Sequence, residues 1–278
     1  MNRLRQIVVL AWPTVAISCF FVMPFFLLLK VSLAHRDESA LWGPGFELTH
    51  YVEMLDPIVL DTLVFSGALA ILVAAISGAV AFPFTYFITR MHRRAQIAWL
   101  ILLLSTLSLS EVLIAFSWQV MLAKRVGLSN VLVWLGLLAE PESLSPNFGA
   151  VLSCLVYLVV PFTVLLLYPA LSRLDRDLTE AARTLGATPM RVFFTVVLPM
   201  MRGPLISSSI VASIFTLGAY VAPSVLGRPE HWTIAILIGK AALTGGNLPF
   251  AAAMAVLLLT ATLGLTGLTA LLGRRSKV

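Results

Sequence analysis

Long apolar runs, separated by short polar and turn-rich segments, dominate the chain. Several runs reach about 20 residues, which is the length that an α-helix needs to cross a bilayer. Apolar residues are continuous within them and do not alternate with polar ones, so helices are expected rather than barrel strands. We predict six membrane-spanning helices, and loops between them, among these 35–58, 124–147 and 227–247. The spans are expected at about 7–34, 59–89, 95–123, 148–172, 204–226 and 248–272.

Composition agrees with a membrane protein. Hydrophobic residues make up 59% of the chain and charged residues only 12%, with a mean hydropathy of +0.97. A soluble domain is far less apolar than this. The first apolar run is too long for the core of a signal peptide, and no small-residue cleavage site follows it, so we interpret it as a retained span. We therefore predict an all-α, polytopic membrane protein in which residues 1–278 form a single transmembrane domain.

Basic residues show which ends of the helices face the cytoplasm. Loops on the cytoplasmic side of a membrane carry an excess of Lys and Arg. On the side of the N-terminus the segments hold Arg3, Arg5, Arg90, Arg93, Arg94, Arg173, Arg176, Arg183, Arg191, Arg202, Arg274, Arg275 and Lys277. The opposite segments hold Arg36, Lys124, Arg125, Arg228 and Lys240, with Lys30 near that face. Both termini and the loop 173–203 are thus expected in the cytoplasm. The net charge of +6 is explained by this topology and by anionic lipid, and it does not indicate nucleic acid.

A polar stretch, 177–199, stands out inside the apolar sequence. Asp177 is a good N-cap, and Glu180 three residues later completes a capping box. Gly186 suits the left-handed position that ends a helix. Thr188-Pro189 can start a second helix, with the proline at its first position, where the missing N–H costs nothing. A first helix this short is marginal alone in water, so the stretch is either an element that docks on a partner or an ordinary amphipathic connector.

The same stretch resembles the loop of permease subunits in ATP-binding-cassette (ABC) importers, whose pattern is E-A-A-x3-G-x9-I-x-L-P. The residues in register are Glu180, Ala181, Ala182, Gly186, Leu198 and Pro199. Val196 stands where the family usually has Ile. We expect Pro199 to break the second helix. The resemblance implies a type I ABC importer permease fold, in which Glu180–Gly186 forms the coupling helix that sits in a cleft of the ATPase subunit.

Glu111 is the one acid deep within an apolar span. An ionisable group there is a functional candidate, because burying it in lipid costs several kcal/mol unless it faces protein or water. One hypothesis makes it a pathway residue that meets a cationic substrate group, with Ser117 and Trp118 nearby. The other makes it a structural acid that is hydrogen-bonded between helices. The surrounding S-E-V-L-I-A-F-S also looks like the third-span segment of polyamine-type permeases.

Residues 217–227 resemble the end of the fifth span in the polyamine and opine branch of these permeases. The matching residues are Gly218, Tyr220, Val221, Pro223, Leu226 and Gly227. Gly and Pro break a helix, and the freed backbone groups must then line a cavity or protein. This end is either a gate, with Tyr220 in the pathway, or an interfacial helix end with Tyr220 in the aromatic belt. Ala219 replaces an acid that some polyamine permeases carry, which weakens the case for a polycation.

Several enzyme motifs are missing from the sequence. It contains no G-x-x-x-x-G-K-[ST], no H-E-x-x-H, no G-x-S-x-G and no metal-ligand spacing. We therefore expect no catalytic residues, no metal site and no cofactor bound by this chain. By resemblance, ATP and Mg²⁺ are bound by a separate ATPase subunit.

The resemblance also implies partners. It predicts an inner-membrane importer with an ATPase dimer, a second permease in a heterodimer, an extracytoplasmic solute-binding protein and the surrounding bilayer. The substrate is expected to be a small amine-bearing solute such as a polyamine, with opines and aminophosphonates as alternatives. A gradient-driven carrier or a non-transporting scaffold remains possible from the residues alone, although both leave the E-A-A-x3-G stretch unexplained.

Overall fold

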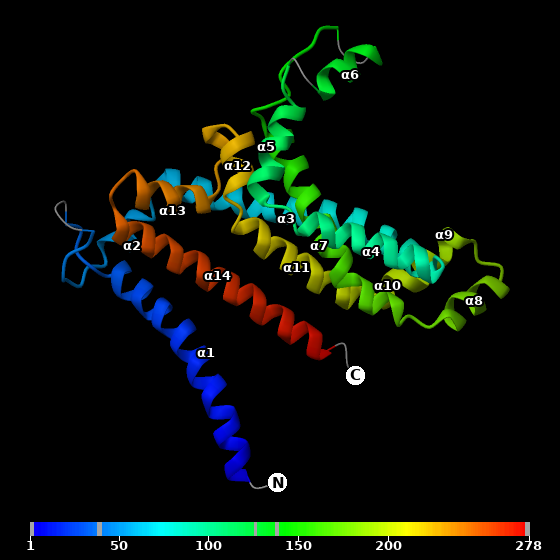
Figure 1. The fold of residues 1–278 in the computed structure, drawn as a ribbon, viewed down its shortest axis with the longest axis horizontal. Helices are drawn as coiled ribbons and strands as arrows, with labels where there is room; N and C mark the ends of the chain where they lie inside the picture. Colours follow the sequence, from blue (N-terminus) through cyan, green and yellow to red (C-terminus); the bar gives the residue numbers. More distant parts are fainter. Residues whose placement is uncertain (1–2, 38–40, 125–126, 137–138, 276–278) are drawn as a thin grey trace. The chain divides into compact units, whose positions relative to one another are not determined.

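The computed structural model describes residues 3–37, 41–124, 127–136 and 139–275. Helices form almost all regular structure in these residues. Four unbroken helices are long and apolar enough to cross a membrane: α1 (Arg3–Ser32), α3 (Pro57–Arg90), α7 (Phe148–Ser172) and α14 (Leu248–Arg275). Two further candidates are bent pairs of helices. Counting each bent pair as one span gives the predicted six (Figure 1).

The first bent pair joins α4 (Arg93–Leu107) to α5 (Glu111–Met121) at an angle of 91°. The sequence predicted one continuous span here. Ser108 ends α4, and its hydroxyl donates to the Leu104 carbonyl at 3.0 Å. Such local bonds from serine compete with the helical backbone pattern. The backbone is then extended at Ser110, and α5 starts in a new direction.

The second bent pair joins the segment Pro189–Met200 to α11 (Arg202–Leu217) at 72°. That segment consists of α9 (Pro189–Val192), a π-helical turn (Phe193–Val197) and α10 (Leu198–Met200). The remaining helices are α2 (Thr49–Glu53), α6 (Leu128–Trp134), α8 (Arg176–Thr184), α12 (Val221–Leu226) and α13 (Ile234–Leu243).

Helix α13 corrects one prediction. The sequence interpretation made 227–247 a loop, yet Ile234–Leu243 is helical, with Ile234 and Ile236 fully buried. Ten residues are too few to cross a bilayer, and the prediction counted only runs long enough to span. Burial of the two isoleucines stabilises this short apolar helix.

The chain divides into two compact units. The first comprises Met1–Asp61 and Ile234–Ala261. Within it, the segment after α1 folds back through side-chain contacts: the Ser32 and Tyr51 hydroxyls lie 2.8 Å apart, and the His50 Nε2 lies 3.1 Å from the Ala34 carbonyl. Over Ala11–Ser32 almost all of α1 is exposed. An apolar helix that is exposed all round needs lipid or another protein helix as its neighbour.

The second unit comprises Thr62–Thr233 and Thr262–Val278. Helix α7 is its centre, because it contacts α4, α5, α11 and α12 (Figure 1). Its buried side chains contribute to two apolar clusters. One contains Leu155 and Val159 together with residues of α3, α5 and α12, and the other contains Val164 and Leu167 with residues of α3 and the π-helical turn. Helix α8 projects from one end of this unit, away from α6 (Figure 1).

Candidate functional site

The polar stretch begins with helix α8, which starts two residues earlier than predicted. Asp175 is the N-cap, since its carboxylate accepts a hydrogen bond from the Asp177 N–H at 3.0 Å. The prediction that Asp177 caps the helix in a box with Glu180 is therefore wrong. Either aspartate has the right chemistry for an N-cap. The short connection from α7, which ends at Ser172, places the helix start at the first of them.

Gly186 ends α8 as the sequence predicted. Its φ of +84° lies in the left-handed region. The Gly186 N–H donates to the Arg183 carbonyl at 2.9 Å, and the Ala187 N–H donates to the Ala182 carbonyl at 3.1 Å. These two bonds form a Schellman motif. A Cβ added to Gly186 would meet nothing within 4 Å, so the backbone conformation and not a lack of space favours glycine here.

The second helix also starts as predicted. The Thr188 hydroxyl accepts from the Arg191 N–H at 3.4 Å, and Pro189 occupies the first helical position. Pro199 does not break this helix, contrary to the prediction. The helix continues to Met200 after the π-helical turn, and the bend follows at Met201. The proline directly follows the π-helical turn, so its missing N–H falls where the regular α-helical hydrogen-bond pattern is already interrupted.

The two sides of α8 differ in burial. Thr179 is only 5% exposed and therefore buried. Leu178, Ala181 and Leu185 are exposed, Leu185 to 88%. Their spacing of three and four residues puts them on one helix face, away from Thr179. A nine-residue helix therefore presents an apolar stripe outward, and we call Leu178, Ala181 and Leu185 the outer stripe.

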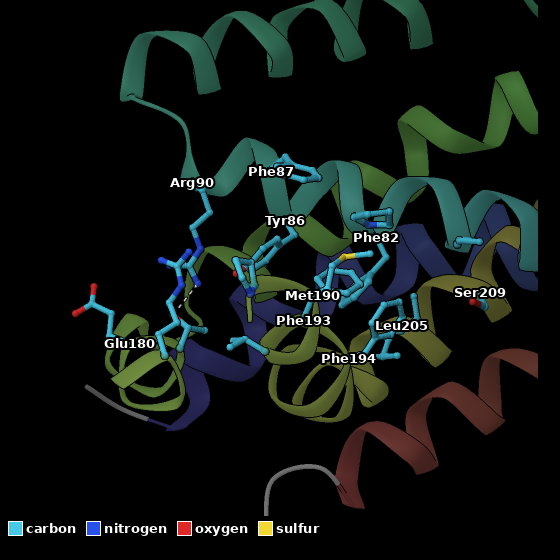
Figure 2. A pocket seen from close by; sticks show the side chains of 18 of the residues that line it. Phe82, Tyr86, Phe87, Arg90, Glu180, Met190, Phe193, Phe194, Leu205 and Ser209 are labelled. Atoms are coloured by element: carbon cyan, nitrogen blue, oxygen red, sulfur yellow. Dashed lines mark hydrogen bonds between the residues drawn. The ribbon is translucent and has the colours of Figure 1, made fainter. Parts of the chain in front are cut away.

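A cavity of about 1110 Å³ lies on the inner side of α8, between α3 and the segment that leads into α11 (Figure 2). Its walls are mainly aromatic and apolar, and charged residues line only the end near α8. Figure 2 shows Arg90 at that end, reaching from α3 towards α8, and Glu180 at the rim. The lining side chains labelled there are Phe82, Tyr86, Phe87, Arg90, Glu180, Met190, Phe193, Phe194, Leu205 and Ser209.

The motif residues of this stretch fall into different environments. Ala181 belongs to the outer stripe, and Ala182 is half-buried beside it. Glu180 is exposed at the cavity rim, and Leu198 is half-buried in the cavity wall. Pro199 is exposed. The structure thus brings Glu180 and Leu198 to one cavity, whereas Ala181 points away from it.

Glu111 lies elsewhere in the second unit, where α5 packs on α12. It is the first residue of α5, and its carboxylate accepts a hydrogen bond from the Ala222 N–H. Ala222 is in the first turn of α12, where N–H groups lack partners within the helix. The carboxylate therefore lies at the N-terminal ends of two helices, which both favour negative charge. The other oxygen, Oε1, is buried and has no hydrogen-bond partner among the described residues.

The other pathway candidates do not converge on Glu111. Trp118 lies seven residues further on the same face of α5 and packs edge-on against Tyr157 at 5.9 Å between ring centroids. Ser117 is exposed on another face, and its hydroxyl donates to the Leu113 carbonyl at 2.7 Å. Tyr220 precedes α12 and is 42% exposed. Of these candidates, only Trp118 shares a face of α5 with Glu111.

Sequence reasoning did not single out Leu178, Leu185 or Arg90 as site residues, although Leu185 lies within the predicted docking segment Glu180–Gly186. Leu178 and Leu185 form most of the outer stripe, and their spacing of seven residues was a readable signal. Arg90 was counted only as a cytoplasmic charge. Its contact with α8 joins residues 89 positions apart, and no local pattern predicts such a pairing.

Comparison with known proteins gives consistent results. Residues 97–278 match the family described as "Binding-protein-dependent transport system inner membrane component". The spermidine/putrescine transport system permease protein PotB of Escherichia coli is 26% identical over 246 residues, covering 88% of this chain and 89% of that protein. The putrescine transport system permease protein PotI of the same organism is 28% identical, covering 90% and 85%.

The fold also resembles that of a solved transporter. A crystal structure of a bacterial alginate ABC transporter, in complex with a periplasmic protein that holds an alginate pentasaccharide, contains a chain with a TM-score of 0.77. That chain is 17% identical, and the match covers 97% of this chain and 94% of the other. The likeness shows that the two chains share the fold.

Proposed function

Because the chain belongs to the family of binding-protein-dependent transport system inner membrane components, we propose that it forms half of the translocation pathway of an ATP-driven importer and receives the motion of an ATPase through α8. The observation that carries this proposal is the outer stripe. Leu178, Ala181 and Leu185 are apolar and exposed on a helix that leaves the bundle. An isolated helix of nine residues is marginal in water, so a partner cleft would stabilise it.

The motion of α8 would drive alternating access. ATP and Mg²⁺ bind to the separate ATPase subunit, and closure of the ATPase dimer displaces α8 and rocks the helices of the second unit. A second permease would supply the other half of the pathway, and the sequence resemblance to the polyamine-type branch implies that the two permeases form a heterodimer. The exposed apolar face of α1 supports such a neighbour. The charge asymmetry supports a cytoplasmic position for both termini and for α8. The segments 35–58 and 227–247 would then lie on the opposite side of the membrane, where they would meet the solute-binding protein.

The proposed solute is a polyamine or another small organic cation that bears amine groups. Relatives matched over most of their length are named for spermidine and putrescine. Glu111 adds a physical argument, because a buried carboxylate oxygen without a partner can accept a hydrogen bond from an ammonium group. The carboxylate's bond to Ala222 supports a structural role as well, and the two roles do not exclude each other.

The test is recovery of partners from the native membrane. The tagged chain is expected to co-purify with an ATPase, a second permease and a solute-binding protein, and ATP-dependent uptake of a polyamine is expected after reconstitution. Leu185→Asp places a charge on the outer stripe and should remove the ATPase. Leu135→Asp is the matched control, since Leu135 is 56% exposed at the end of α6 and lies outside the segments 35–58 and 227–247. Uptake by the purified chain alone, driven by an ion gradient, would overturn the proposal.

A further inference from the structure

The contact between Arg90 and Thr179 joins α3 to α8. Arg90 is the last residue of α3, and its Nη2 donates to the Thr179 hydroxyl at 3.3 Å (Figure 2). Thr179 is buried on the side of α8 opposite the outer stripe. The helix that would dock on the ATPase is thus held from behind by a side chain of α3.

The guanidinium of Arg90 is held in position by its own helix. It lies over the ring of Tyr86, one turn earlier, with 5.0 Å between its central carbon and the ring centroid. Arginine stacks well on an aromatic face, and its planar group leaves little freedom to the N–H groups that donate. A cation at the C-terminal end of a helix is also favoured by the helix dipole. These contacts orient Nη2 towards α8 before any partner binds.

The helix behind Arg90 is firmly packed. Phe82 and Ile88 of α3 are buried in the same apolar cluster as Val164 and Leu167 of α7. Tyr86, which supports the guanidinium, packs against that cluster and against Phe193 of the π-helical turn, at 5.5 Å between ring centroids. A displacement of Thr179 therefore reaches the core of the second unit through Arg90 and Tyr86, because a close-packed interior transmits strain.

We propose that Arg90 is a positioning residue that transmits the displacement of α8 to α3 through its hydrogen bond to Thr179. This inference rests on the proposed function, because it needs α8 to be the ATPase-docking helix. It assigns Arg90 a role beyond its positive charge. Lysine would keep that charge but lacks the planar group that stacks and donates in a fixed direction.

The experiment measures solute taken up per ATP hydrolysed by the complete importer in proteoliposomes. Arg90→Met and Thr179→Val each remove one side of the hydrogen bond while keeping similar volume. We expect either to leave assembly and ATP hydrolysis in place and to lower uptake per ATP by about fivefold, the lower end of typical allosteric coupling. The double variant should be no worse than a single one, because both remove the same contact. Thr179→Ser, which keeps the hydroxyl, should restore coupling.

Arg94→Met is the matched control, because Arg94 is an exposed arginine only four residues after Arg90, in the first turn of α4, and it should couple normally. Normal coupling in both Arg90→Met and Thr179→Val would overturn the inference. Full activity of Arg90→Lys would overturn it as well, since charge against lipid phosphate would then suffice. If Arg90→Met does not assemble, the test is the comparison of uptake per ATP between Thr179→Val and Thr179→Ser. A wild-type complex that lacks an ATPase, or takes up solute without ATP, would instead refute the proposed function.

Discussion

Substitution of Gly186 tests whether the conformation of the α8 terminus is required for coupling. Gly186 has a φ of +84°. An L-residue in the left-handed region costs about 1–2 kcal/mol. No atom lies within 4 Å of the position of an added Cβ, so no clash within the chain adds to this cost. For Gly186→Ala we therefore expect a local penalty of about 1 kcal/mol, which lowers the ratio of intact to unravelled α8 terminus about fivefold.

A series of three variants separates backbone conformation from side-chain size. Asparagine visits the left-handed region several-fold more often than most residues, and β-branched residues do so least. Coupling should thus decrease in the order Gly186→Asn, Gly186→Ala, Gly186→Val, although asparagine is larger than alanine. Global stability should change little, because Gly186 is exposed outside the apolar clusters.

The assay is solute uptake per ATP hydrolysed in proteoliposomes, with thermal melting of the purified complex as the control. Better coupling by the alanine variant than by the asparagine variant would refute the reasoning. That order would mean that the volume at the partner contact matters and not the left-handed backbone. An equal loss in all three variants would refute it too, because their conformational penalties differ.

Three other predictions follow from the packing. Asp175→Ala removes the N-cap of α8 and should cost about 1 kcal/mol of local helix stability, measured as faster amide exchange in 176–184. A smaller effect is expected for Asp177→Ala. A larger effect for Asp177→Ala would instead support Asp177 as the N-cap. Glu111→Gln keeps an acceptor for the Ala222 N–H, so it should preserve the melting temperature of the complex but lower polyamine uptake. Glu111→Ala should lower uptake and also destabilise the complex by about 1–3 kcal/mol. Undiminished uptake in Glu111→Gln would exclude the pathway role. Leu155→Ala should cost about 2–5 kcal/mol of stability, because Leu155 is fully buried on α7. Leu166→Ala should be close to neutral, because Leu166 is 41% exposed on the same helix. Equal effects of the two substitutions on thermal melting would place Leu155 outside the core.

Several features of the molecule could be predicted from sequence because they are local. The helix Phe148–Ser172 has the predicted bounds, since a backbone in lipid must satisfy its hydrogen bonds within one continuous apolar segment. The left-handed Gly186 and the Thr188-Pro189 helix start were predictable for a similar reason. Each depends on side-chain and backbone chemistry within a few residues.

Tertiary structure alone decided the features that join distant segments. Asp175 rather than Asp177 caps α8, because the connection from α7 sets where the helix starts. The bend after Ser108 falls where Ser105, Thr106, Ser108, Ser110 and Glu111 interrupt the apolar run, and the sequence did not show that the helix changes direction there. Arg90 meets Thr179, and Glu111 meets Ala222, only after the helices have packed. Sequence therefore determined the long apolar helices and where α8 ends, but not the short helices α2, α6 and α13 within predicted loops. Packing determined which polar groups are partners, because a hydrogen bond needs its donor and acceptor within about 3 Å and only the folded chain brings these residues together.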